Sequence, residues 1–134
     1  MERLLIPLHV TGAAIVIGVL FLQSMMIVMM HRLETEEQRS GVRMTLIRVE
    51  KFIYYPILAV TLLTGLYAMR VTDALRQGVW LHYKFIFLIV LIGLGLMVRD
   101  SLRKDLASKG KAMGVHVLIF IVGFCVVYLA VFKP

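Results

Sequence analysis

The sequence predicts an all-α membrane protein, a four-transmembrane-helix up-down bundle. The first observation is composition: the chain of 134 residues is 60% hydrophobic and has a mean hydropathy of +0.90, far above the apolar share of a soluble domain. The second is segregation of charge, because Lys84 is the only charged residue inside a long apolar run. This combination is typical of an integral membrane protein.

Four apolar runs are long enough to cross a bilayer, which takes roughly 20 helical residues. They cover about residues 4–30, 52–69, 79–98 and 112–132, and we expect the segments between them to be loops. The runs use most of the chain, which predicts a single transmembrane domain over residues 1–134. Pro56 lies inside the second run, where it should remove a backbone hydrogen bond and kink the helix.

The distribution of positive charge predicts the orientation. Ten of the 15 Lys and Arg residues fall in segments 31–51 and 99–111, which an up-down bundle places on one side. The positive-inside rule puts these two segments in the cytoplasm and both termini outside. The net charge of +7 then reflects topology and contact with the lipid bilayer, and no nucleic acid is needed to explain it.

Small and polar residues at helical spacing predict the inward face of each span, since helices in lipid approach each other at small residues. We expect a bundle interior with scattered polar groups, for which helix packing with a few hydrogen bonds is the simplest reading. The four predicted stripes are His9, Gly12, Ala13, Val16 and Gln23; Tyr54, Leu58, Thr61 and Gly65; His82, Ile86, Ile89 and Gly93; and His116, Phe120, Gly123 and Val127.

Two histidines at similar membrane depth are candidate metal ligands, because ionisable residues inside a membrane are costly and usually functional. His9 and His82 lie near the outer ends of the first and third spans, which run in the same direction and can face each other. Paired imidazoles on facing helices favour a haem before other metals, with room for its flat ring beside Gly12. The alternative is two interfacial histidines hydrated in the headgroup layer.

Lys84 is the third candidate, two residues beyond His82. Its ammonium can meet a carboxylate such as a porphyrin propionate, which makes it a cofactor-binding and catalytic candidate, or it can snorkel outward to the interface. Trp80 is a further candidate for the cofactor site; its alternative is a place in the aromatic belt at the membrane surface.

Copper handling is a second class of function. Thioethers together with an imidazole suit Cu(I), and methionine is also an ordinary gap-filling residue. The candidate copper ligands are Met25, Met26, Met29, Met30 and His31. His31 and His116 can also form a second metal pair or hydrogen-bond locally. A non-catalytic accessory subunit of a larger membrane complex is the third alternative.

Several motifs occur together in a particular order. They are Leu8-His9-Val10, the basic stretch from Arg48 to Lys51 leading to Pro56 and Gly65-Leu66, Trp80-Leu81-His82-Tyr83-Lys84, and a Lys133-Pro134 ending. In this order the chain resembles, over nearly its whole length, the HemJ-type protoporphyrinogen oxidases and the related CopD-like group of small four-helix bacterial membrane proteins. The tryptophan–histidine–lysine motif is the most specific part of the resemblance.

The resemblance implies haem b bound within the bundle, with His9 and His82 as ligands and Lys84 important to the site. It also implies an oxidoreductase that oxidises protoporphyrinogen IX or passes electrons in the membrane, with porphyrin as one partner and a quinone or respiratory complex as electron acceptor. It places the protein in the bacterial inner membrane. The electron acceptor and any homo-oligomer stay open at this level.

Overall fold

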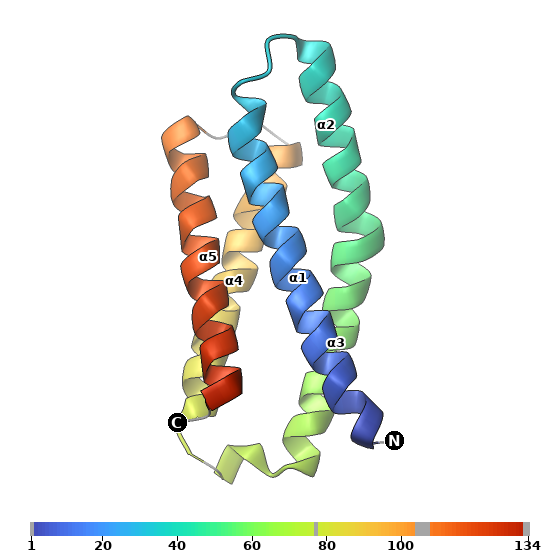
Figure 1. Cartoon of the computed structure of the whole chain (residues 1–134), viewed down its shortest axis with the longest axis vertical. Coiled ribbons are helices and arrows are strands. Elements are labelled where there is room, and N and C mark those ends of the chain that lie inside the picture. Colours follow the sequence, from blue (N-terminus) through green and yellow to red (C-terminus); the bar gives the residue numbers. More distant parts are fainter. Residues whose placement is uncertain (1, 77, 104–107, 133–134) are drawn as a thin grey trace.

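The computed structural model describes residues 2–76, 78–103 and 108–132, and within them every regular element is helical. Figure 1 shows the helices side by side in a bundle, with both termini at one end. We call this the terminal end and the opposite one the basic end. The elements are α1 (Glu2–Met30), α2 (Glu36–Val49), the π turn η1 (Glu50–Tyr54), α3 (Tyr55–Val71), the 3-10 turn η2 (Ala74–Arg76), α4 (Trp80–Arg103) and α5 (Lys109–Phe132).

Four helical rods are long and apolar enough to cross a membrane, which confirms the four predicted spans by length and composition. Much of their apolar surface is uncovered: Leu63, Ile89 and Phe124 are 68%, 69% and 64% exposed. Apolar surface on this scale requires cover by lipid or by another protein. The rods are Arg3–Met30, Glu36–Val71, Trp80–Leu102 and Gly110–Phe132.

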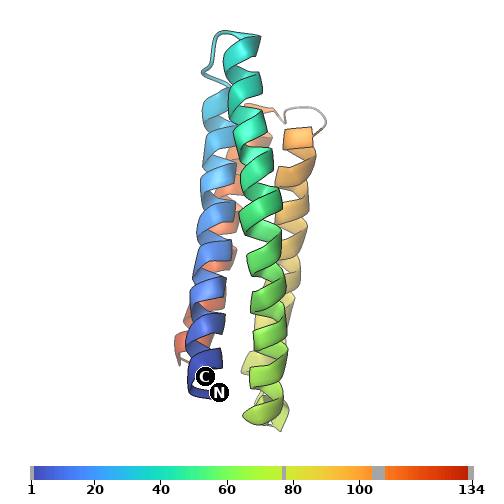
Figure 2. The same ribbon diagram turned by 90° about the vertical axis from the view of Figure 1, so that its right-hand side faces the viewer.

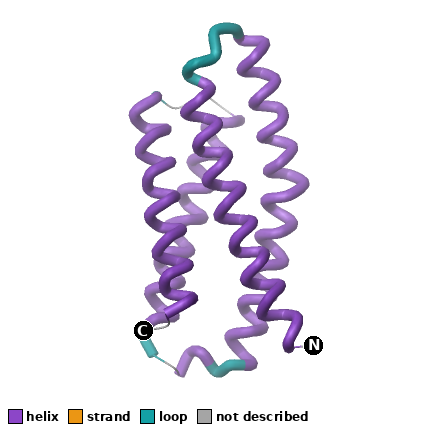
Figure 3. Tube along the Cα trace, in the orientation of Figure 1, coloured by secondary structure: helices purple, strands orange, loops and turns teal. Residues whose placement is uncertain are grey.

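The prediction that residues 31–51 form a loop is wrong. After a short turn (Figure 3) the chain enters α2, whose first turn is capped by the Thr35 side chain accepting a hydrogen bond from the backbone N–H of Gln38 at 3.2 Å. The charged residues that suggested a loop are good helix formers. Helix Glu36–Val71 is about 54 Å long, so α2 extends beyond a hydrocarbon layer of about 30 Å and projects past the end of α4 (Figure 2).

A π turn accommodates Pro56. Proline has no N–H to donate to the carbonyl of Phe52. Immediately before it, the N–H of Tyr55 donates to the carbonyl of Glu50, five residues back, which is the π-helical pattern. The expected disturbance is therefore one widened turn, and it carries two buried side chains, Glu50 and Tyr54.

α1 is the central helix of the bundle. It packs against α3 on one side and α5 on the other, and α4 pairs with α5, whereas α3 and α4 make little contact with each other. Figure 1 shows α1 between α3 on one side and the pair of α4 and α5 on the other. The best-buried core side chains are Leu20, Met30, Leu102 and Ile119.

The predicted inward stripes of the first two spans are confirmed, but that of the third is wrong. His82, Ile86, Ile89 and Gly93 all lie on the exposed face of α4. Because α4 is apolar on all sides, composition does not mark its inner face. Gly95, not Gly93, meets the interior, since a Cβ there would lie 2.8 Å from the Tyr54 hydroxyl. The fourth stripe is mixed: Gly123 is buried and His116 half-buried, whereas Phe120 and Val127 are exposed.

Candidate functional site

His9 lies half-buried between α1 and α3, in the half of the bundle nearer the terminal end. Its Nδ1 is 2.8 Å from the backbone oxygen of Thr61, and because a carbonyl only accepts, Nδ1 carries the proton and donates. Thr64 Oγ1 lies 3.4 Å from the same nitrogen. In the neutral ring Nε2 then carries the lone pair, the form in which imidazole binds a metal.

Two glycines allow α1 and α3 to approach at this point. A Cβ on Gly65 would lie 2.7 Å from Cε1 of His9, and a Cβ on Gly12 would overlap the Thr61 hydroxyl. Gly12 is therefore buried against a threonine side chain, and the prediction that it leaves room for a cofactor ring is wrong. The small residues serve close helix contact, the usual packing device in membranes.

Gly12→Ala is expected to destabilise the bundle by about 1–3 kcal/mol, because the added methyl must push Thr61 and α3 away. Gly18→Ala is the matched control on the same helix, since nothing lies within 4 Å of a Cβ there. Unfolding by denaturing detergent, followed by circular dichroism, measures the difference. Equal stability of the two variants would show that the contact between α1 and α3 is looser than described.

Lys84 and His82 lie on different faces of α4. Lys84 is half-buried. His82 is exposed, as expected for a residue two positions away and so about 200° around the helix. The structure thus places His82 on the exposed face of α4, whereas His9 is half-buried between α1 and α3.

Trp80 is buried, with 7% of its surface exposed, and packs with Leu81 and Met69 in a small apolar cluster at the start of α4. Its burial does not fit the aromatic-belt alternative, in which the ring would face the headgroups. Through Met69, this cluster joins the start of α4 to the end of α3.

His116 hydrogen-bonds locally, as one of the two sequence alternatives predicted. Ser24 Oγ lies 2.8 Å from the Phe21 carbonyl and donates to it, so the hydroxyl accepts from Nδ1 of His116 at 2.7 Å. The His116 ring also lies 4.6 Å from the Phe21 ring, centroid to centroid. Within residues 2–76, 78–103 and 108–132, no group of three or more His, Cys, Asp or Glu residues can hold a metal ion.

The candidate copper methionines lie on two faces of α1. Met25 and Met29 are exposed, at 42% and 46%, whereas Met30 is fully buried and Met26 is half-buried. Residues four apart share a helix face, so the four thioethers form two separate pairs. One pair points to the surroundings and the other into the bundle.

An ion pair that the sequence did not predict joins a buried glutamate of η1 to α4. Glu50 is 2% exposed, and its Oε1 lies 3.8 Å from Nε of Arg99 on α4. The Arg99 guanidinium also lies over the Tyr55 ring, 5.9 Å from its centroid. A signal was present, because Glu50 lies four residues before Tyr54 and so continues its inward stripe, but Glu50 was assigned to a loop.

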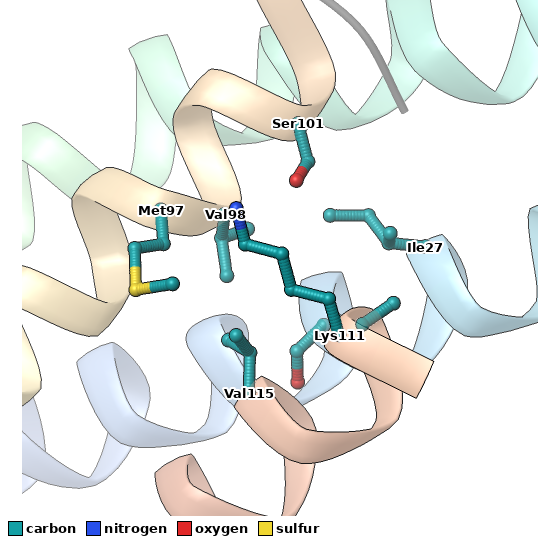
Figure 4. A pocket seen from close by; sticks show the side chains of 8 residues that line it. Ile27, Met97, Val98, Ser101, Lys111 and Val115 are labelled. Atoms are coloured by element: carbon teal, nitrogen blue, oxygen red, sulfur yellow. The ribbon is translucent and has the colours of Figure 1, made fainter. Parts of the chain in front are cut away.

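The residues fit one half of a haem site. His9 offers an oriented ligand, but it lines neither of the two hollows described next. One, of about 10 Å³, is lined by Ser24 and reached by Ser101 and Lys111 (Figure 4). The other is an open groove of about 200 Å³ between α1 and α2.

No protein-family model matches the chain, and neither the curated proteins nor the solved structures include a match. The resemblance drawn from the sequence motifs therefore stays a prediction.

Proposed function

We propose that the chain is a membrane haem protein that holds haem b through His9. The observation that carries the proposal is the hydrogen bond from Nδ1 of His9 to the Thr61 carbonyl, at 2.8 Å inside an apolar helix pair. Metal-ligating histidines usually donate their second ring nitrogen to a carbonyl or carboxylate, which sets the tautomer and orients the ring.

The chain supplies orientation, charge and exclusion of water. Thr61 and Gly65 hold the imidazole in one position, and Lys84 balances a carboxylate of the porphyrin through a charge-assisted hydrogen bond. The apolar helices around them keep the site dry. When bound, haem supplies one-electron redox chemistry, which in this proposal serves oxidation of protoporphyrinogen IX or electron transfer to a membrane acceptor. His82 is not the second ligand from the same chain.

Metal content of the purified protein tests the proposal. After expression with ample haem precursor and extraction in mild detergent, we expect a Soret band and haem b in a one-to-one ratio to the chain. Copper, measured on the same sample, should be absent, because the Met25–Met30 thioethers do not converge. Bound copper without haem would favour copper handling, and a sample with neither would favour an accessory subunit.

A further inference from the structure

The turn after α1 and the first half of α2 contain buried side-chain nitrogen atoms without partners. They are Nε2 of His31, Nε of Arg39 and Nε of Arg43, and none has a hydrogen-bond partner within the described part of the chain. Buried polar atoms in proteins are almost always hydrogen-bonded, and an exception often marks a water or ion that belongs at the site. Three such nitrogens at one end of the fold therefore suggest a missing ligand.

The two arginines lie one turn apart on the same face of α2, and both are half-buried. Arg39 is anchored to the turn that begins at His31, because its Nη2 donates to the carbonyl of Leu33 at 2.8 Å. Glu36 lies 3.8 Å from Arg39, but its own side chain is 78% exposed. His31, Arg39 and Arg43 therefore form a cationic group, and the carboxylates beside it, Glu34, Glu36 and Glu37, are exposed.

A hydrogen bond between α1 and α2 shows at which level of the bundle this group lies. Nε2 of Gln23 donates to the carbonyl of Leu46 at 3.2 Å, and the two helices run in opposite directions (Figure 1). Because both rise equally per residue, Arg43 is level with Met26 and Arg39 with Met30, the last residue of α1. The group therefore lies beside the last turn of α1, where its apolar run ends.

We propose that His31, Arg39 and Arg43 bind a phosphate group at the basic end of the bundle, supplied by the headgroup of an anionic membrane lipid. Guanidinium N–H groups are permanently protonated and match the oxygens of phosphate in a fork geometry. An anion accepts from both arginine Nε–H groups and from His31. This site is independent of the haem proposal, since it uses other residues at the opposite end.

Lipid retention in matched variants tests the site. The protein is reconstituted in nanodiscs of phosphatidylglycerol and phosphatidylcholine, extracted in mild detergent, and its bound lipid is counted by native mass spectrometry. We expect retention of one phosphatidylglycerol per wild-type chain, a loss of roughly tenfold in Arg43→Gln, since a lost charged hydrogen bond costs about one such factor, and little change in Arg48→Gln. Arg48 is exposed on the same helix, so its variant removes the same charge away from the site.

Three further outcomes bear on the proposal. His31→Gln serves as a second variant with a weaker expected loss, and helicity by circular dichroism shows that each variant is folded. Inorganic phosphate is added to protein in phosphatidylcholine alone as a further test. If it raises the melting temperature while the wild type shows no preference for phosphatidylglycerol, the ligand is a soluble anion and the lipid assignment is overturned. Equal loss in Arg43→Gln and Arg48→Gln would reduce the effect to general charge, and no selection in the wild type would leave only water at these nitrogens; either result overturns the site.

Discussion

His9→Ala is expected to remove haem from the purified protein, with loss of the Soret band. The imidazole is the oriented ligand in our proposal, held through Nδ1 by the Thr61 carbonyl, and alanine offers nothing in its place. Gly65→Ala should act in the same direction, because its Cβ would lie 2.7 Å from the His9 ring and displace it. Haem per chain, measured by absorbance after extraction, gives the result.

The other membrane histidines provide the controls. His116→Ala removes an imidazole bonded to Ser24 on the opposite side of α1, and we expect its haem content to match the wild type. His82→Ala should also retain haem, because the side chain is exposed on α4. A wild-type spectrum in His9→Ala would contradict the assignment, as would loss of haem in His82→Ala alone.

Arg99→Leu is expected to destabilise the bundle by about 2 kcal/mol and Glu50→Gln by about 1 kcal/mol. The asymmetry follows from exposure, since the Glu50 side chain is 3% exposed and that of Arg99 is 43% exposed. Removing the arginine deprives a buried carboxylate of its cation, whereas neutralising the glutamate leaves an arginine that reaches solvent. The estimate lies below the ~3–5 kcal/mol of a fully buried pair because Arg99 is partly exposed.

Arg76→Leu is the matched control for this comparison. Arg76 and Asp73 form a pair of similar separation, 3.7 Å, but their side chains are 86% and 67% exposed. Exposed pairs contribute little to stability, so this variant should unfold at the wild-type denaturant concentration. Detergent-induced unfolding followed by circular dichroism compares all three variants. If Arg99→Leu were as stable as Arg76→Leu, the pairing of Glu50 with Arg99 would contribute nothing measurable to the stability of the bundle.

The sequence determined the number and approximate limits of the spans, because a helix of about 20 apolar residues matches the thickness of the hydrocarbon core of a membrane. It also identified the inner faces of α1 and α3, where His9, Gly12, Thr61 and Gly65 contrast with their apolar neighbours. Polar and small residues are informative in lipid, since polar groups must find partners and small ones permit close approach. Whether haem binds at this face remains a prediction.

Tertiary structure decided which side chains of α4 meet α1. Both His82 and Lys84 are polar residues in an apolar helix, and their spacing puts them on nearly opposite faces, so only the packing of α4 shows that Lys84 is half-buried and His82 exposed. The same holds for Glu50. Its charge suggested a loop, but in the structure it lies in the continuous α2–α3 rod and pairs with Arg99. When a helix is apolar on every face, the burial of apolar surface does not decide which face turns toward the bundle, because lipid solvates every face equally well. Contacts with neighbouring helices set it instead, and they depend on the whole bundle.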